Sequence, residues 1–246
     1  MIRIYNSPLE LSQHLAQFFV EICLQSVSDR GRFTVSLTGG SSPKELYELL
    51  ATEPFAGQIP WDKVFIFWGD ERCVPDNDPQ NNARMTSEAL LDHVSVPAGN
   101  VFRMQGSLPA GEAAEAYEEI LHRFFAPGEP AFDLILLGMG DNAHTASLFP
   151  HTQVLTEKTA WVKGLYIDEV KMDRITLTAP LINRSLNIAF IVFGAGKAQT
   201  LHDVLEGDYD IQAKPVQLIS PDYGKLYWFI DKAAAGKLSA GSIAAN

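Results

Sequence analysis

The sequence predicts an α/β protein with a mainly parallel β-sheet that is covered by helices on both faces. Two observations support this class. Short strand-like segments alternate with amphipathic helical segments along the chain, and the strand-like segments are apolar at nearly every position. With 246 residues, of which 46% are hydrophobic, the chain can bury a large core. We expect one domain over residues 1–246.

The predicted elements begin with a strand at 2–5 and a helix that starts with a Ser-Pro-x-Glu sequence. In that sequence Ser7 is the expected N-cap, Pro8 the first helical residue and Glu10 the reciprocal cap. Further strands are expected at 32–37, 64–68, 133–137, 175–178, 187–193, 216–219 and 226–230, and further helices at 41–50, 81–93, 110–125 and 197–207. Residues 126–130, which read APGEP, are expected to form a loop rather than a domain linker.

Composition excludes several classes of function. The net charge is −11 and the isoelectric point is near 4.9, which disfavours nucleic acids and anionic membranes as partners. A small anionic ligand would need local devices, such as helix N-termini and a few cationic side chains. Two cysteines give no disulfide framework or CxxC metal site, and no apolar segment is long enough to span a bilayer. We expect a cytoplasmic protein, a monomer or small homo-oligomer.

A glycine loop follows the strand that ends near Leu37. Gly39 and Gly40 allow the backbone to approach a ligand, and a second Ser-Pro-x-Glu sequence predicts a helix with Ser42 as N-cap and Glu45 as reciprocal cap. A strand, a glycine loop and a helix N-terminus together suit a phosphate group. An ordinary, well-capped turn explains the same residues equally well, because the Gly-Lys-Ser/Thr of a Walker sequence is absent.

A charged segment follows the next strand. Asp70 and Arg72 come directly after apolar residues 64–68, which places them at the carboxyl edge of the expected sheet, near the glycine loop. An arginine there can clamp phosphate, and an aspartate can hold sugar hydroxyls or a proton. A solvated loop is the alternative interpretation.

The segment LGMGDNAHTASLFP, residues 137–150, contains a lone histidine after a Gly-x-Gly turn. It matches the dinucleotide pattern G-x-G-x-x-A, but Pro150 ends any helix too early for that fold. We expect His144 in the first turn of a short helix, where the helix dipole keeps the ring neutral, as a general base requires. A structural histidine bonded to a backbone carbonyl is the alternative.

Two more cationic residues stand near strand ends. Lys197 lies at another strand-to-helix junction, and Arg174 begins an apolar segment. The other histidines show no HxH or HExxH spacing, so we expect no metal site.

Several segments jointly resemble one family, in the family's order from about Leu37 onward. They read LTGGSSP, WGDERCVP with NNARM, LLGMGDNAHTASLFP, RITLTAPLIN and FGAGKA. They resemble the 6-phosphogluconolactonases, which are relatives of the glucosamine-6-phosphate deaminases. The resemblance implies a modified Rossmann-like sheet and hydrolysis of 6-phosphogluconolactone to 6-phosphogluconate, the second step of the pentose phosphate pathway, without a cofactor.

The resemblance also implies roles for particular residues. His144 is the expected catalytic base, with Asp141, Asn142 and Asp70 around it. The residues expected to bind the phosphate are Gly39, Gly40, Ser41, Ser42, Arg72 and Lys197. Further substrate contacts are expected from Thr38, Arg174, Gly138 and Gly140, and backbone N–H groups near the last two are candidates for an oxyanion hole.

One position departs from the family pattern. The family usually has Asp-Gly-His where this chain has Asn142, Ala143 and His144. An asparagine accepts a hydrogen bond but carries no charge for a forming imidazolium. We expect that Asp141 or another carboxylate supplies part of this charge, or that the charge is dispensable. Replacing Asn142 with Asp is then expected to raise the rate only if the charge is missed. Ala143 in place of glycine predicts a backbone that is not left-handed.

The sequence disfavours two other functions. Amino-sugar phosphate deaminase-isomerases have a sequence like HIAFNEPG that begins at the histidine, and they use its Glu in ring opening. This chain has Phe149 at the position of that Glu. A non-catalytic sugar-phosphate sensor would need a DNA-binding partner domain, and the acidic chain has no room for a basic helix-turn-helix.

Overall fold

The computed structural model describes residues 1–125 and 131–241, so the predicted APGEP loop lies outside the described residues. Its centre is a six-stranded sheet in the order β1-β9-β8-β5-β2-β3, and every neighbouring pair in it is parallel. These strands are β1 (Ile2–Tyr5), β2 (Phe33–Leu37), β3 (Val64–Trp68), β5 (Leu134–Gly138), β8 (Asn187–Val192) and β9 (Lys225–Asp231).

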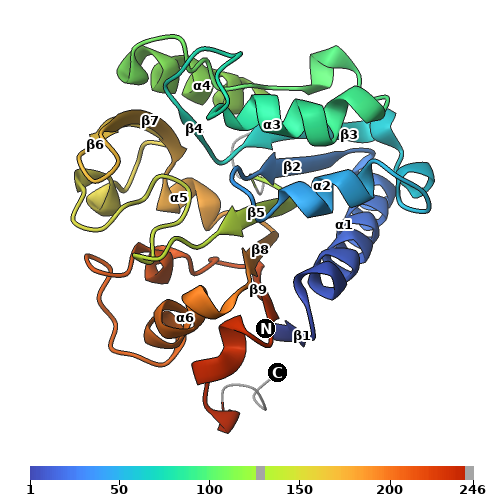
Figure 1. The fold of residues 1–246 in the computed structure, drawn as a ribbon. Coiled ribbons are helices and arrows are strands. Elements are labelled where there is room, and N and C mark those ends of the chain that lie inside the picture. Colours follow the sequence, from blue (N-terminus) through green and yellow to red (C-terminus); the bar gives the residue numbers. More distant parts are fainter. Residues whose placement is uncertain (126–130, 242–246) are drawn as a thin grey trace.

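Helices cover both faces of this sheet (Figure 1). They are α1 (Pro8–Arg30), α2 (Lys44–Leu50), α3 (Asn82–Ala89), α4 (Ala110–Phe124), α5 (Ala179–Ile182) and α6 (Ala198–Leu205). Short 3₁₀ turns are η1 (Ala56–Gln58), η2 (Trp61–Lys63), η3 (Leu91–His93), η4 (Ala98–Asn100), η5 (Gln153–Thr156), η6 (Ala195–Lys197), η7 (Pro215–Leu218) and η8 (Ala234–Lys237). None of the helices in the described ranges combines the length and apolar composition needed to cross a bilayer.

Two apolar layers lie on opposite faces of the sheet, because successive side chains of a strand point to opposite sides. In β5, Leu134 and Leu136 pack into the layer beneath α1, α2 and α3, while Ile135 and Leu137 pack into the layer with α4, α5 and α6. Burial on both sides explains why these strands are apolar at consecutive positions. The predicted fold class is confirmed.

The strand expected at 216–219 was wrong. Residues 216–218 lie in η7 and Ile219 follows it, because Pro215 begins a 3₁₀ turn rather than a strand. The sequence also did not predict a second, antiparallel sheet in the order β4-β7-β6, made of β4 (Asp70–Arg72), β7 (Met172–Leu177) and β6 (Val162–Ile167). β4 was missed because its three residues are all charged and a short charged segment has the composition of a loop.

The order in which the chain adds strands to the main sheet reverses between β2 and β5, although the two strands are parallel. After β2 the chain continues to β3 on one side, and after β5 it continues to β8 on the other. The loops that follow β2 and β5 therefore diverge and leave a crevice at the carboxyl ends of these two neighbouring strands, as in other open α/β sheets. The glycine loop and the His144 segment are the two loops that meet there.

Glu71 fastens β4 to the start of α3. Its side chain is fully buried and accepts hydrogen bonds from the backbone N–H groups of Asn82 (2.8 Å) and Ala83 (2.9 Å), which are the first residues of the helix. It also accepts from the N–H of Arg72 at 2.8 Å. A carboxylate at a helix N-terminus satisfies N–H groups that have no partner within the helix. Burial raises the pKa of Glu71 to about 7, against the opposing effect of these three donors.

The raised pKa of Glu71 predicts a pH-dependent stability. Because the folded-state pKa lies above the ordinary value of 4.5, the folded protein holds the proton more tightly. The free energy of unfolding should therefore fall as pH rises from about 4.5 to about 7, by at most ~3 kcal/mol, and then level off. Denaturant unfolding at pH 5, 6, 7 and 8 measures this slope.

The slope should be reduced in Glu71→Gln, which cannot ionise, although the variant is less stable at every pH because it loses an acceptor. Glu48→Gln, a change on the exposed face of α2, is the matched control and should keep the wild-type slope. Equal slopes in wild type and Glu71→Gln would contradict the assignment.

Candidate active site

A cavity of about 290 Å³ lies at the reversal point of the sheet and brings together most of the residues singled out in the sequence. Those predicted residues are Thr38, Gly39, Gly40, Ser41, Ser42, Asp70, Arg72, Gly138, Gly140, His144 and Arg174. Three others, Asp141, Asn142 and Lys197, lie beside this set and are not part of the cavity wall. Asn82, Met139, Ala146, Phe149 and Val170 complete the wall and were not predicted.

The glycine loop lies directly against the start of α3. A Cβ at Gly39 would come within 1.8 Å of the Asn82 side-chain oxygen, so only glycine fits there. The Asn82 amide is held in turn by the backbone oxygen of Asp70, at 2.9 Å. At the entry of the loop, the buried hydroxyl of Tyr47 accepts from the N–H of Thr38 and donates to its oxygen. The loop is thus held against two neighbouring elements.

The predicted cap of α2 was wrong. The helix begins at Lys44, its N-cap position is Pro43, and no side chain caps it. Glu45 accepts a hydrogen bond from Ser12 of α1 at 3.0 Å instead of closing a capping box. Ser41 and Ser42 therefore stay in the loop beside the cavity, where their polar groups face a ligand site rather than the helix end.

Two arginines are placed side by side in the cavity wall. Arg72 of β4 and Arg174 of β7 are direct partners in the antiparallel ladder. Both Nε atoms are buried and have no hydrogen-bond partner among the described residues. Arg174 is 8% exposed, and burial, followed by the charge of Arg72, lowers its pKa against the opposing effect of Asp70. Placing two like charges side by side with their Nε atoms buried is costly, and a doubly charged anion between them would remove the cost.

The segment with His144 is an irregular loop, so the expected short helix was wrong. Ala143 has φ 61° and Ala146 has φ 47°, both in the left-handed region that alanine rarely adopts. The expectation that Ala143 excludes such a backbone was therefore also wrong. The strain is held by surrounding hydrogen bonds, among them Gly140 N–H to His144 O (2.8 Å) and Val216 N–H to Ala143 O (3.1 Å). Since the Gly140 N–H is engaged in the loop, it is not available to an oxyanion.

The imidazole of His144 is enclosed on several sides. Its ring stacks on Phe149, with the ring centroids 4.0 Å apart and an angle of 10° between the planes. On another side a Cβ at Gly140 would come within 2.1 Å of the ring, so the glycine makes room for the histidine. Burial lowers the pKa of His144 to about 4, partly opposed by Asp70 and Glu169. The ring is neutral near pH 7, as expected, but the cause is burial and not a helix dipole.

Asp70 and Asn142 face the histidine from different elements. Asp70 is 7% exposed and accepts a hydrogen bond from the hydroxyl of Ser147 at 2.7 Å, which ties β4 to the histidine loop. The Asn142 side-chain oxygen lies 2.6 Å from His144 Nδ1 and also accepts from the His144 backbone N–H at 3.1 Å. Asn142 Nδ2 donates to both carboxylate oxygens of Glu169, each at 2.8 Å.

Asp141 and Lys197 bind each other beside the site. Their side-chain atoms Oδ1 and Nζ are 2.6 Å apart, and Lys197 lowers the pKa of Asp141. The hydroxyl of Thr200 donates to the Asp141 backbone oxygen at 2.7 Å, which anchors this end of the loop to α6. The geometry thus gives Asp141 a cation as its partner and not the histidine ring.

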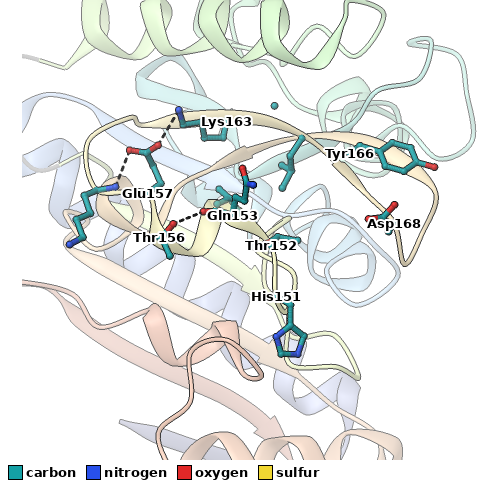
Figure 2. A pocket seen from close by; sticks show the side chains of 12 residues that line it. His151, Thr152, Gln153, Thr156, Glu157, Lys163, Tyr166 and Asp168 are labelled. Carbon is teal, nitrogen blue, oxygen red and sulfur yellow. Dashed lines mark hydrogen bonds and ion pairs between the residues drawn. The ribbon is translucent and has the colours of Figure 1, made fainter.

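A second and larger cavity, of about 870 Å³, lies between η5 and β6, away from the predicted site residues (Figure 2). Two of its charged groups, Lys163 and Glu157, pair with each other. Lys163 lies 3.0 Å from Glu157, and that carboxylate also accepts from the N–H groups of residues 158–160. Within the ranges that the structure describes, no group of three or more His, Cys, Asp or Glu side chains is placed to hold a metal ion.

Among the residues of the smaller site or its support that the sequence did not reveal, four make specific contacts. Asn82 stands in the quoted NNARM segment, but its contact with the glycine loop crosses elements that are far apart in the chain. Tyr47 looks like an ordinary apolar residue of an amphipathic helix. Phe149 was noticed only for the carboxylate that it replaces, and Glu169 lies in a hairpin turn without any motif. Each contact depends on tertiary packing.

Comparison with known proteins places the chain in a family. It matches the family of glucosamine-6-phosphate isomerases/6-phosphogluconolactonase over residues 6–228. The 6-phosphogluconolactonase of Nostoc sp. is 44% identical over 222 residues, which cover 87% of this chain and 88% of that protein. The 6-phosphogluconolactonase of Synechocystis sp. is 41% identical over 218 residues, with the same two shares covered.

Solved structures agree with this. The crystal structure of a protein named devB superposes with a TM-score of 0.89 at 30% identity and covers 97% of this chain and 100% of its own. The 6-phosphogluconolactonase from Trypanosoma brucei superposes with a TM-score of 0.86 at 27% identity, over 97% of this chain and 98% of its own. The protein therefore belongs to the glucosamine-6-phosphate isomerase/6-phosphogluconolactonase family.

Proposed function

We propose that the protein hydrolyses 6-phospho-D-glucono-1,5-lactone to 6-phospho-D-gluconate in the oxidative branch of the pentose phosphate pathway. The observation that carries the proposal is the content of one cavity. It holds a histidine that is neutral near pH 7 on one side, and on another the glycine loop with two arginines whose buried Nε atoms have no partner among the described residues. These are a base for water and a receptor for a phosphate, the two parts that a phosphorylated lactone needs.

His144 acts as the general base. The lactone is a cyclic ester, so water can be the nucleophile and no covalent enzyme intermediate is required. The imidazole removes a proton from this water as it attacks the lactone carbonyl, and the carbonyl oxygen becomes an oxyanion. When the oxyanion re-forms the carbonyl, the ring C–O bond breaks, the imidazolium gives its proton to the leaving ring oxygen, and the new carboxylic acid loses its proton to solvent. Base catalysis of this kind contributes on the order of 10²- to 10⁴-fold, and positioning of the bound lactone supplies more.

The phosphate lies between the arginine pair and the glycine loop. Arg72 and Arg174 offer buried N–H donors and the residues from Gly39 to Ser42 offer backbone and hydroxyl groups. Binding a dianion there removes the repulsion between the two guanidinium groups, which favours phosphorylated substrates over neutral lactones. The contribution of Lys197 stays a prediction, since its ammonium is paired with Asp141.

The site does not favour the deaminase-isomerase alternative. At the position where those relatives have a Glu, this chain has Phe149. Its ring stacks on the histidine ring and presents a hydrocarbon surface in place of a carboxylate. The sensor alternative has no observation in its favour here. It is tested by the same assay, because a sensor binds the sugar phosphate without turning it over. The expected compartment of the protein is the cytoplasm, and its expected partner is a small phosphorylated lactone.

The first prediction concerns His144→Ala. Lactone hydrolysis should fall by roughly 10²- to 10⁴-fold, mainly in kcat, because the base is lost while the phosphate receptor is intact. The assay uses 6-phosphogluconolactone generated freshly in the cuvette, with the spontaneous rate subtracted and unphosphorylated gluconolactone in parallel. No wild-type turnover above background would refute the proposed function, and full activity of the variant would refute the base.

A second prediction concerns the pH dependence of wild-type activity. Burial places the pKa of His144 at about 4, below its ordinary value of 6.5, so the neutral, active form persists in mild acid. The acidic limb of kcat, measured at saturating lactone so that ionisation of the free substrate's phosphate at about pH 6 does not enter, should lie near pH 4. The kcat at pH 5.5 should be within about twofold of that at pH 7. A limb near pH 6.5 in a protein that stays folded by circular dichroism would contradict the burial of this ring.

A third prediction concerns Arg174→Met. The KM for the phosphorylated lactone should rise by roughly tenfold or more, because charge-assisted hydrogen bonds to the phosphate are lost. Turnover of unphosphorylated gluconolactone should not change, and the folded protein should not be less stable, since a buried like charge is removed. Arg123→Met, on the exposed face of α4, is the matched control. Equal losses for both substrates would argue against a phosphate role.

A further inference from the structure

The side of His144 that faces away from the cavity is bonded to an amide and not to a carboxylate. Asn142 Oδ1 lies 2.6 Å from Nδ1 of the ring, and Asn142 Nδ2 lies 2.8 Å from each oxygen of Glu169. Glu169 comes from the exposed turn between β6 and β7, 27 residues further along the chain. A chain of three side chains thus runs from this turn to the catalytic ring.

The polarity of this chain follows from its two ends. An ionised carboxylate only accepts hydrogen bonds, so the NH₂ group of Asn142 must face Glu169 and its oxygen must face His144. The backbone N–H of His144, which only donates, fixes the same oxygen from another direction at 3.1 Å. Nδ1 must then carry the proton, and Nε2 keeps its lone pair. This is the tautomer that a base acting through Nε2 requires.

Charged groups from several elements act on the ring of His144. The charged groups that act on His144 are Asp70 from β4 and Glu169 from the β6–β7 turn, opposed by Lys197 from η6 and Arg174 from β7. Asp141, on the histidine's own loop, is bound to Lys197. Among these groups Glu169 is the carboxylate connected by hydrogen bonds to Nδ1. It therefore stabilises a positive charge that forms on the ring when water is deprotonated.

We propose that Glu169 is a positioning residue that acts on His144 through Asn142, so that the pair Asn142 and Glu169 does the work of a single aspartate at residue 142. The proposal rests on the proposed lactonase function for its kinetic consequences. Glu169, rather than Asp141, is then the carboxylate that supplies the negative charge that Asn142 lacks.

Exchanging the two side-chain types tests the pair. Asn142→Asp alone places two carboxylates against each other, and Glu169→Gln alone removes the charge, so each should lower kcat by about tenfold with little change in KM. In the double variant the carboxylate accepts from Nδ1–H and the new glutamine donates to it. Its kcat should return to within about threefold of wild type. The expected sign for Asn142→Asp is thus reversed by the carboxylate that lies opposite.

Asp168→Asn is the matched control, because it removes a charge from the neighbouring exposed residue of the same turn and should leave kcat unchanged. A Glu169→Gln protein with wild-type kcat, or a double variant no better than the single ones, would overturn the proposal. A role in folding alone would not give restored activity in the double variant.

A measurement without substrate separates the proposal from the function. Imidazole ¹⁵N spectra at pH 7, assigned with His144→Gln, should show protonated Nδ1 and bare Nε2 in wild type. Glu169→Lys, which can only donate, should turn the amide and shift the ring toward the Nε2-protonated tautomer, whereas Asp168→Lys should not. A wild-type ring protonated at Nε2, or no response to Glu169→Lys, would overturn the relay. If wild type shows the expected tautomer but no turnover, the lactonase function fails and the relay stands.

Discussion

The parallel pairing of β2 with β5 is the constraint on which the site depends. Val35 and Ser36 pair with Leu134 and Ile135, yet the two strands lead to opposite sides of the sheet. Their following loops must part, and the opening between them is where a ligand can reach backbone groups from both. The glycine loop and the histidine loop are neighbours for this reason, although about a hundred residues separate them in the chain.

Local charge, and not overall charge, fits the protein for an anion. The chain carries a net charge of −11, so its long-range field repels phosphate. Arg72 and Arg174 lie on adjacent strands with their Nε atoms buried, and they act at short range in a poorly solvated place, where an electrostatic contact is stronger than in water. The second, antiparallel sheet holds this pair, since β4 and β7 set the two arginines in register.

Close packing keeps the ring of His144 neutral. Phe149 on one side and the bare backbone of Gly140 on another reduce its contact with water, and this partial burial lowers its pKa. A ring held this way also needs a partner that fixes its tautomer. An amide backed by a carboxylate meets that need with two residues. The same loop has a left-handed backbone at Ala143 and Ala146, which surrounding hydrogen bonds hold in place.

The sequence by itself determined the layered parallel sheet and the strand ends where polar residues gather. Runs of apolar residues in strands that are buried on both faces, and the glycine and charged residues that follow those runs, can be read directly from a sequence. Only the tertiary structure decided the state of the histidine loop, the pairing of Arg72 with Arg174 and the link from Glu169 to Asn142. The helix expected around His144 failed because long-range contacts, such as Ala143 with Val216, override local backbone preference. Hydrogen-bond partners that are distant in the chain leave no periodic pattern, so their chemistry is visible only once the chain has folded.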